Sequence, residues 1–415
     1  MQVSRRGLLL GAAVGGGLVA AWALVPRTYD NPLEPEEGET AFDAWIRIAR
    51  DGVISVAVPQ LEMGQGITTL IPQVIAMELG ADWRQVAVEP APISGAYANA
   101  ALAERWAPMW APVLTNLADD EGSLLARRFA EDARFTATAE GSWIAAYERP
   151  CREAAAGVRA VLCKAAAEQW DTDWQECRTE SGFVLWEEKR LPFGALAAAA
   201  ADFSVPDPPE LRASDPSPPA PLPVAGEVVE LEEPFPRLDL PSKVDGSFQF
   251  AADVRLPGMV YAAIKHGPLN EATLTGYDAD AGAGVRGFVG AVAGKRWLAA
   301  LAETSWAAEQ AVEAMAPRFS VARLVDSAAM EAALDRGQRS GEAVRIATRG
   351  SGDEQMGKAD IALRYEIAPL LHGQIEPTTA TAWLHDGRLD LWLATQAPEQ
   401  ARRTARQRAD DRADG

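Results

Sequence analysis

The chain has 415 residues, of which 48% are hydrophobic and 24% charged, a composition typical of folded globular proteins. Because single hydrophobic cores stop growing at about 250 residues, this length predicts two or three domains. The formal net charge of -20 repels phosphate backbones and no stretch rich in Lys and Arg offsets it, which excludes nucleic acid as a partner.

Residues 1–26 have the pattern of an export signal. Arg5 and Arg6 directly precede an uncharged run rich in glycine and alanine that ends at Pro26. Paired arginines before such a run are typical of a twin-arginine signal, which predicts a periplasmic protein. A buried N-terminal helix is the alternative, and the many glycines disfavour it. Cleavage after Ala23 and retention as a membrane anchor both stay open.

Neither cysteines nor histidines predict a metal site. The chain has three of each: Cys151, Cys163, Cys177, His266, His372 and His385. The cysteines contain no Cys-x-x-Cys pair for zinc or an iron–sulfur cluster, and an odd number leaves no complete disulfide set. No two histidines are four residues apart. We therefore expect small structural cysteines and no histidine-based metal centre.

The first region predicts a mixed α/β arrangement. Ala44–Ile48 and Val53–Val58 alternate as two strands of a hairpin around Asp51 and Gly52. Apolar residues then recur at helical spacing over Ile67–Leu79, and Trp83–Glu89 has a strand pattern. The order strand, helix, strand is typical of an α/β sheet.

A long helix and a stiff linker follow. Trp143–Trp170 is rich in alanine, with Val158 and Leu162 on one face, which predicts a long amphipathic helix. Residues 206–223 contain eight prolines, which favour an extended connector and hence a domain boundary.

The second half again mixes strands and helices. Strands are expected over Phe248–Ala252, Val260–Ile264, Ile361–Ile367, Ala380–Leu384 and Leu389–Ala394, a helix over Trp297–Met315, and a loop over Thr348–Lys358. Leu389–Ala394 would pair with the preceding strand through a turn at His385–Gly387. Ala401–Gly415 has almost no apolar residue, so we expect no packed core there.

The segment Glu62–Gly66 (EMGQG) is the most informative motif. Its two glycines let the backbone approach an anion closely, and the helix that follows offers free N–H groups at its positive end. This geometry suits a phosphate. A tight turn between strand and helix needs the same glycines without any ligand, so the spacing alone is weak.

The wider flank resembles the molybdopterin-binding large subunits of the xanthine dehydrogenase and aldehyde oxidase family, nearest to the isoquinoline 1-oxidoreductase beta type and its exported aldehyde dehydrogenase relatives. The similarity lies in Val58–Thr69 with Ala81–Val86, in Lys243–Ser247 with Asp253–Ala262, and in His372–Pro377 with Thr395–Pro398. Arg178–Phe183 and Leu191–Gly194 match lesser landmarks. The resemblance covers about residues 41–403, with the motifs in the family's order.

The resemblance implies a mixed α/β fold with a partial molybdopterin-binding domain and an α/β hammerhead domain. The expected parts are a signal at 1–26, an N-terminal molybdopterin-binding-type region at 41–205, a linker at 206–236, the hammerhead domain at 237–347, the start of a second molybdopterin-binding region at 348–403 and a polar tail at 404–415.

Site residues can be carried over motif by motif. Gly64, Gln65 and Gly66, with Thr68 beside them, would contact the pterin dinucleotide. Gly141 and Ser142 stand where the family has a Gly-Gly-Ser turn, but Glu140 replaces its first glycine, and a carboxylate repels a diphosphate unless a cation intervenes.

His372 and Glu376 match a segment that approaches the family's substrate pocket. Thr68, His372 and Glu376 each have a structural alternative, as a hydrogen-bonding group within the fold.

The implied activity is hydroxylation of aldehydes or N-heterocycles with water as the oxygen source. The implied cofactor is molybdenum–molybdopterin in the cytosine dinucleotide form, and electrons would pass to a small partner subunit with 2Fe–2S clusters and on to a cytochrome c.

The family's general base is a glutamate in the last part of a much longer subunit. It has no counterpart here, so no catalytic residue is named and a truncated reading frame is expected. Two alternatives are a non-catalytic scaffold that keeps the fold without the metal, and an exported small-molecule binding module unrelated to molybdenum.

Overall fold

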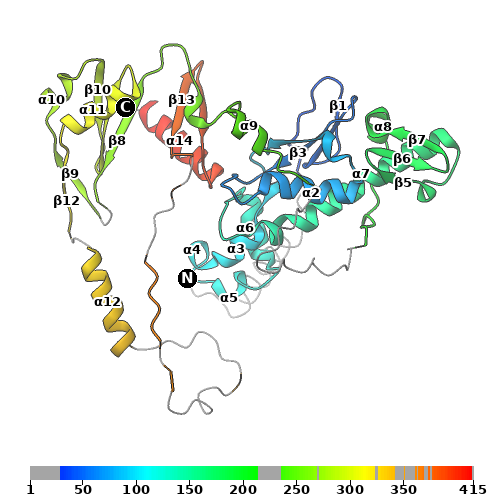
Figure 1. The fold of residues 1–415 in the computed structure, drawn as a ribbon, viewed down its shortest axis with the longest axis horizontal. Coiled ribbons are helices and arrows are strands. Elements are labelled where there is room, and N and C mark those ends of the chain that lie inside the picture. Colours follow the sequence, from blue (N-terminus) through cyan, green and yellow to red (C-terminus); the bar gives the residue numbers. More distant parts are fainter. Residues whose placement is uncertain are drawn as a thin grey trace, which may run out of the picture. The chain divides into compact units, whose positions relative to one another are not determined.

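The computed structural model describes residues 29–213, 235–268, 271–322, 326–341, 350, 360–361, 363–368, 373 and 376–413. The predicted signal segment and His372 lie outside these residues, as does most of the predicted loop at 348–358. The chain forms two compact units, Met1–Val254 with Gly373–Gly415, and Arg255–His372 (Figure 1). The predicted boundary at the proline-rich linker stays a prediction.

The first unit is built on a four-stranded sheet. Its strands are β1 (Glu39–Ala41), β2 (Ile46–Ala49), β3 (Ile54–Val58) and β4 (Val86–Pro90), in the order β1-β2-β3-β4. β2 and β3 form the predicted antiparallel hairpin, whereas β3 and β4 are parallel. Parallel neighbours require a crossover connection, and that connection carries the glycine turn.

The crossover helix is α2 (Ile67–Leu79), as predicted from its apolar spacing. It begins after Gly66 and ends at Gly80, both with left-handed backbone. Glycine adopts this conformation without steric penalty, which explains both boundaries. Trp83–Gln85 is a 3-10 turn, η1, rather than the start of a strand.

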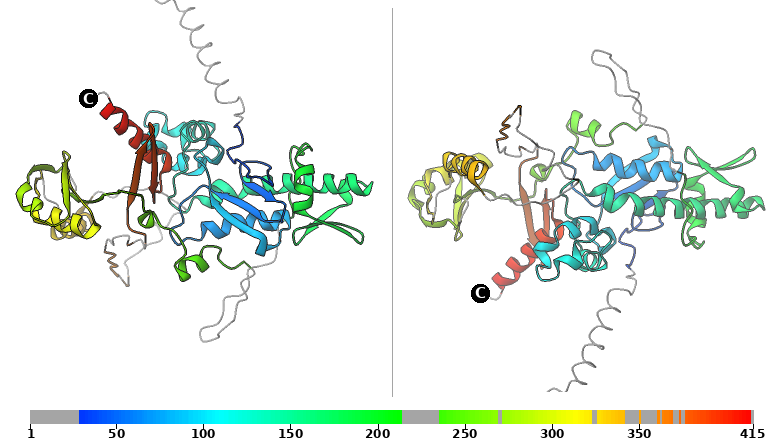
Figure 2. Two further views of the ribbon diagram at one scale, coloured as in Figure 1. Left: turned by 90° about the horizontal axis from the view of Figure 1, so that it is seen from above. Right: turned by 90° about the horizontal axis from the view of Figure 1, so that it is seen from below.

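Two further helices complete the main core. α7 (Trp143–Trp170) is the predicted long helix, and α8 (Phe193–Ala200) follows a small antiparallel sheet of β5 (Arg178–Glu180), β6 (Phe183–Trp186) and β7 (Lys189–Pro192). Figure 2 shows α7 running alongside α2. Residues from the sheet, α2, α7 and α8 share one buried cluster, which includes Ile46, Ile71, Val158 and Leu196.

A buried carboxylate fastens the chain that follows α8. Glu78 on α2 is 3% exposed and accepts hydrogen bonds from the guanidinium groups of Arg152 and Arg159 on α7, at 3.0 and 2.6 Å. It also accepts from the backbone N–H of Arg212, at 2.7 Å. One carboxylate therefore holds three segments together.

Short helices follow β4, namely η2 (Gly95–Tyr97), α3 (Ala100–Arg105), α4 (Ala107–Trp110), α5 (Thr115–Ala118) and α6 (Leu124–Asp132). α3 and α6 pack through small residues, Ala103, Ala126 and Ala130, all fully buried. The stacked rings of Trp110 and Phe129 extend this contact.

The predicted strand at Phe248–Ala252 is wrong. α9 (Leu240–Asp245) and a loop precede the 3-10 turn η4 (Ala251–Asp253). Phe248 and Phe250 pack against each other instead. Among the described residues no neighbouring strand pairs with the backbone here, so the alternating pattern has no sheet to join.

The C-terminal part of the first unit is a hairpin and a helix. β13 (Ala380–His385) and β14 (Arg388–Leu393) pair as predicted around Asp386 and Gly387, both with positive φ. α14 spans Pro398–Ala413. The tail is therefore helical, which the expectation of a coreless polar segment did not include, because Arg, Glu, Gln and Ala all favour helix.

The second unit holds the antiparallel sheet β10-β11-β8 and the pair β12-β9. Its elements are β8 (Tyr261–His266), β9 (Thr273–Gly276), α10 (Ala279–Ala283), β10 (Phe288–Ala293), β11 (Trp297–Ala302), α11 (Ser305–Ala314), β12 (Arg318–Ser320) and α12 (Ser327–Ser340). The strand near Val260 is confirmed as β8.

Two expectations for this unit need correction, although the second part of the predicted helix Trp297–Met315 is confirmed as α11 (Ser305–Ala314). Trp297–Ala302 is the central strand rather than the start of a helix, because a fully apolar run buried on both faces carries no period-two signal. Of Ile361–Ile367, the described residues form no strand. Their side chains alternate as in a strand, but no described backbone pairs with them.

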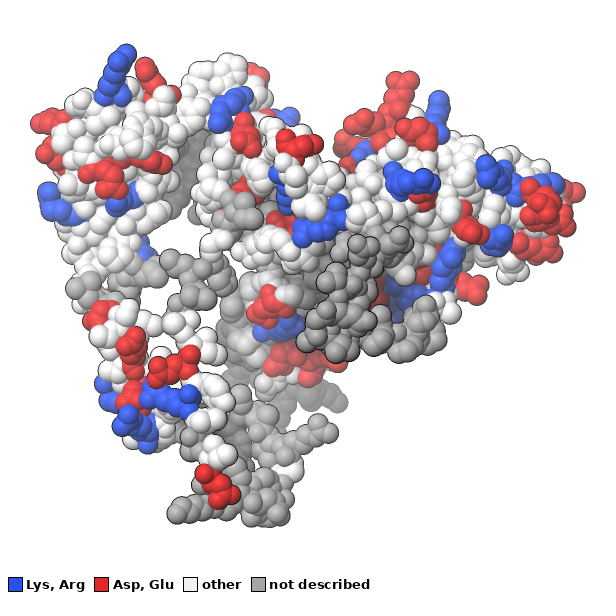
Figure 3. All heavy atoms as spheres, viewed as in Figure 1, with Lys and Arg blue, Asp and Glu red and all other residues white. Residues whose placement is uncertain are grey.

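On the face drawn in Figure 3, acidic and basic side chains are interspersed over the described residues. Among these residues, no helix combines the length and apolar character needed to cross a membrane.

Candidate functional site

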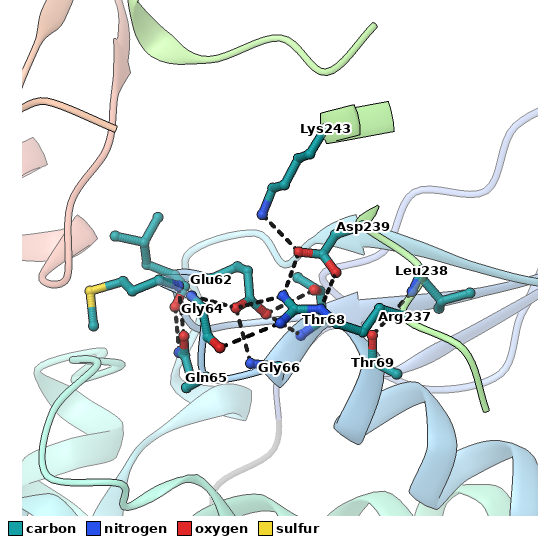
Figure 4. Close-up of polar contacts among 12 residues, drawn as sticks. Glu62, Gly64, Gln65, Gly66, Thr68, Thr69, Arg237, Leu238, Asp239 and Lys243 are labelled. Atoms are coloured by element: carbon teal, nitrogen blue, oxygen red, sulfur yellow. Dashed lines mark hydrogen bonds and ion pairs between the residues drawn. The ribbon is translucent and has the colours of Figure 1, made fainter. Parts of the chain in front are cut away.

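The glycine turn before α2 has the conformation expected from its sequence. Gly64 and Gly66 have φ of 101° and 85°, values that other residues rarely adopt. Gly66 is the N-cap of α2, and as a glycine it has no side chain of its own to cap the helix. The two glycines thus turn the backbone amides of the segment toward one point (Figure 4).

The carboxylate of Glu62 occupies that point. Oε1 accepts hydrogen bonds from the N–H groups of Gly64 and Gly66, at 2.7 and 3.0 Å. Oε2 accepts from the N–H and the hydroxyl of Thr68, at 3.1 and 2.9 Å. The cradle predicted to bind a phosphate therefore holds the chain's own oxyanion.

These contacts control the ionisation of Glu62. Burial favours the neutral acid, but the hydrogen bonds from Gly66, Thr68 and Gly64 outweigh burial and hold the pKa of Glu62 below its usual value. The side chain is 8% exposed. At neutral pH the cradle thus contains a negative charge.

Gln65 closes the turn on itself. Its side-chain Nε2 donates to the carbonyl oxygen of Leu61 at 2.7 Å, and its Oε1 accepts from the N–H of Met63 at 2.6 Å. The side chain thus makes hydrogen bonds within the turn, and its predicted contact with a pterin stays a prediction.

A cationic segment lies against the turn. The guanidinium of Arg237 is 3.4 Å from both Oε1 of Glu62 and the carbonyl oxygen of Gly64. Asp239 receives hydrogen bonds from Arg237 at 3.0 and 2.8 Å and from Lys243 at 2.7 Å. Arg237 chiefly, with Lys243, overcomes burial and lowers the pKa of Asp239 to about 2. Glu62, Arg237, Asp239 and Lys243 form one network of alternating charge (Figure 4), termed here the Arg237 network.

The second predicted turn precedes α7. Glu140 and Gly141 have φ of 55° and 59°. The carboxylate of Glu140 accepts a hydrogen bond from the indole N–H of Trp106 at 2.7 Å, and the guanidinium of Arg105 is 3.7 Å away. The sequence predicts repulsion of a diphosphate here unless a cation intervenes, and Arg105 places one positive charge beside the Glu140 carboxylate.

Ser142 is buried next to this turn. Its hydroxyl accepts from the side-chain amide of Asn99 at 2.8 Å and donates to the carbonyl oxygen of Ala139 at 2.9 Å. These bonds hold the start of α7. The space beside the Cα of Gly141 is open.

Three predicted motifs converge at Thr138. Its hydroxyl accepts from the N–H of Leu61 at 3.0 Å. Its backbone N–H donates to the carbonyl oxygen of Gln396 at 2.8 Å, and the side chain of Gln396 donates back to the carbonyl oxygen of Thr138 at 2.7 Å. The two turns and the segment Thr395–Pro398 are thus brought together, as one shared site requires.

Glu376 has a structural partner. Its carboxylate accepts from the N–H of Ala251 at 3.0 Å. The hydroxyl of Thr379, three residues along, is buried without a hydrogen-bond partner among the described residues. The predicted roles of Glu376 and of His372 in a substrate pocket stay predictions.

Among the described residues, the side chains that commonly bind metals do not gather at one place. In the described ranges, no three His, Cys, Asp or Glu side chains group as a metal site. The three cysteines are free thiols. Burial raises the pKa of Cys163 to about 12, so this thiol is not a ready nucleophile.

Sequence reasoning missed the roles of Glu62 and Arg237. Glu62 was part of the motif, yet an acidic side chain beside an expected anion gave no reason to place it inside the cradle. Arg237 is 175 residues from Glu62 and lies in no repeat or spacing pattern. The sequence shows only that Arg237 stands two positions before Asp239, which allows a local ion pair but does not indicate a contact with Glu62.

Comparison with known proteins supports the resemblance. Residues 10–109 match the family described as the molybdopterin cofactor-binding domain, and this range contains Glu62–Gly66. The chain is thus similar, at low identity, to proteins of the molybdopterin-containing hydroxylase type.

Three relatives of the chain illustrate the similarity. It is 27% identical to the isoquinoline 1-oxidoreductase beta subunit of Brevundimonas diminuta over 301 residues, 65% of this chain and 34% of that protein. It is 25% identical to a membrane-bound aldehyde dehydrogenase (pyrroloquinoline-quinone) of Gluconacetobacter polyoxogenes over 415 residues, 95% of this chain and 48% of that protein. It is 24% identical to a nicotinate dehydrogenase subunit of Pseudomonas putida over 389 residues, 89% of this chain and 28% of that protein. The chain spans less than half the length of each.

Proposed function

We propose that the chain binds a molybdenum–molybdopterin cofactor, in the cytosine dinucleotide form, with the diphosphate at the glycine turn. The observation that carries this proposal is the position of the Glu62 carboxylate. Three backbone amides and one hydroxyl surround its two oxygens at hydrogen-bond distance, so the donor set fits an oxyanion. The match of residues 10–109 supports the same cofactor.

Gly64, Gly66 and Thr68 would hold the diphosphate, and Gln65 would face the pterin. Gly141, at the second turn, has open space for a ligand, and the start of α7 adds a favourable dipole there. Bound molybdenum supplies the centre at which substrate is oxidised. The chain's own residues bind and orient this group.

The proposed activity is oxidation of aldehydes or N-heterocycles, with water as the oxygen source. It is supported by the names of the relatives, an isoquinoline oxidoreductase, an aldehyde dehydrogenase and a nicotinate dehydrogenase. Two of them are named as subunits, which supports a partner. We propose a small subunit with 2Fe–2S clusters, a cytochrome c acceptor and export to the periplasm, the last on Arg5 and Arg6.

A direct experiment measures molybdenum and released cytidine monophosphate in the purified chain, expressed in a host that makes the cofactor. Near-stoichiometric amounts of both are expected. The matched variant Gly66→Val, which places a branched side chain at φ 85°, should lose both while keeping the helical circular dichroism of wild type.

A second candidate is a scaffold that keeps the fold without the metal. It is favoured by the same carboxylate, because a negative charge in the cradle opposes a diphosphate. Molybdenum and nucleotide at background levels in the folded protein would favour the scaffold.

A further inference from the structure

The occupant of the cradle carries the same sign of charge as the proposed ligand. Glu62 makes four hydrogen bonds within the turn, and these hold its pKa low. A diphosphate cannot use the amides of Gly64, Gly66 and Thr68 while the carboxylate holds them. The Glu62 side chain must therefore leave before an anion enters.

Arg237 is a cation that lies directly beside the Glu62 carboxylate, at the edge of the cradle. Its guanidinium is already 3.4 Å from Oε1 of Glu62. Asp239 fixes the guanidinium through two hydrogen bonds, and Lys243 adds a second positive charge to Asp239. A rotation of the Glu62 side chain would break its hydrogen bonds with the neutral backbone amides and leave its carboxylate paired with the charged guanidinium of Arg237.

We propose that Glu62 is a built-in competitor for the anion cradle and that Arg237 receives its carboxylate when a diphosphate binds. The inference rests on the proposed function and assigns a further role to two residues of that site. With the cradle empty of ligand, Glu62 keeps the amides aimed at one point and prevents their exposure to water. With ligand present, the pair Glu62–Arg237 keeps the displaced charge compensated.

Glu62 lowers the affinity of the cradle for an anion, because part of the ligand's binding free energy is used to displace the carboxylate. Removing the charge of Glu62 should therefore strengthen anion binding. A purely structural glutamate predicts the reverse, since loss of four hydrogen bonds would disorder the cradle. The two roles differ in the sign of one measurement.

The test is calorimetric titration of the metal-free full chain with inorganic pyrophosphate. Glu62→Gln should bind pyrophosphate about tenfold more tightly than wild type. This change in Kd corresponds to a binding free energy more favourable by roughly 1.4 kcal/mol. Glu62→Asp, which keeps the charge but shortens the reach to Thr68, should bind at an intermediate affinity. Glu168→Gln, at an exposed position on α7, makes the same charge change and should match wild type.

Arg237 is tested by a double-mutant cycle. Arg237→Gln should weaken binding in wild type and have little effect in Glu62→Gln. Equal weakening in both backgrounds would mean that Arg237 contacts the ligand and does not receive Glu62.

The outcomes also separate this inference from the proposed function. If wild type binds and Glu62→Gln binds equally or more weakly, the competitor role is wrong and the anion site stands. If Glu168→Gln also binds pyrophosphate more tightly than wild type, the gain in affinity comes from the lower net negative charge of the chain. That result would overturn the inference. If none of the variants binds pyrophosphate, the anion site itself is wrong and the competitor role falls with it.

Discussion

Gln396 and Thr138 exchange two hydrogen bonds across 258 residues of sequence. This pairing fastens the segment between β14 and α14 to the chain that enters the second turn, and Thr138 in turn binds Leu61. The two glycine turns and the C-terminal segment thus share one anchor point, so its loss should affect all three.

Gln396→Ala should destabilise the first unit by about 1 to 2 kcal/mol, because it removes one hydrogen bond and leaves the Thr138 carbonyl oxygen without its donor. Urea unfolding followed by tryptophan fluorescence measures the change. Gln400→Ala, at an exposed position on α14, is the control and should lie within about 0.5 kcal/mol of wild type. Equal stabilities for the two variants would show that the pairing contributes nothing.

Asp43 should make stability fall as pH rises. Burial dominates over the hydrogen bonds from Trp45 and Ile46 and raises its pKa to about 6. The folded state therefore binds the proton more tightly than the unfolded state, whose pKa is near 3.8. The stabilisation is complete below pH 3.8 and is lost as pH rises through 6.

Asp43→Asn should consequently be more stable than wild type at pH 8, by about 2 to 3 kcal/mol, since the amide oxygen still accepts from both N–H groups. The difference should shrink toward pH 4. Asp51→Asn, at an exposed turn residue that also accepts a backbone N–H, is the control. A difference that stays constant between pH 4 and 8 would contradict the raised pKa.

Asp239 should act in the opposite direction. Its pKa is lowered to about 2, so its stabilising effect is present above pH 3.8 and is lost as pH falls through 2. Asp239→Asn should lower stability by about 2 kcal/mol at pH 7. Acid titration of both proteins should bring the two curves together near pH 2. Curves that remain parallel down to that pH would exclude the charge effect.

Glu78→Gln should be the most destabilising of these substitutions, at about 3 kcal/mol or more. It leaves Arg152 and Arg159 partly buried without a counter-charge, which costs more than a lost surface pair. Limited proteolysis should detect release of the segment around Arg212. Glu153→Gln, in an exposed pair with Arg149, should change stability by less than about 1 kcal/mol.

Local features were readable from the sequence where they depend on near neighbours. The helical spacing of apolar residues after the glycine turn predicts the helix over Ile67–Leu79, and His385–Gly387 marks the hairpin turn. The β2–β3 hairpin was equally clear. In each case the residues that decide the structure lie close together along the chain.

Features that depend on distant residues were not readable. Trp297–Ala302 is a strand because β8 and β10 flank it on both sides, which its apolar run does not reveal. Phe248–Ala252 alternates but has no strand to join. At the site, the glycine turn was found by motif, whereas the contact of Arg237 with Glu62 exists only through the fold. That the Glu62 carboxylate occupies the cradle likewise depends on how the folded chain places this side chain, which the motif does not indicate.

The most direct test of the anion cradle is nuclear magnetic resonance of the 15N-labelled chain during titration with inorganic pyrophosphate. The amide signals of Gly64, Gly66 and Thr68 should shift most, together with that of Arg237 as Glu62 moves. Shifts confined to other parts of the chain, or no shift at millimolar pyrophosphate, would contradict the account.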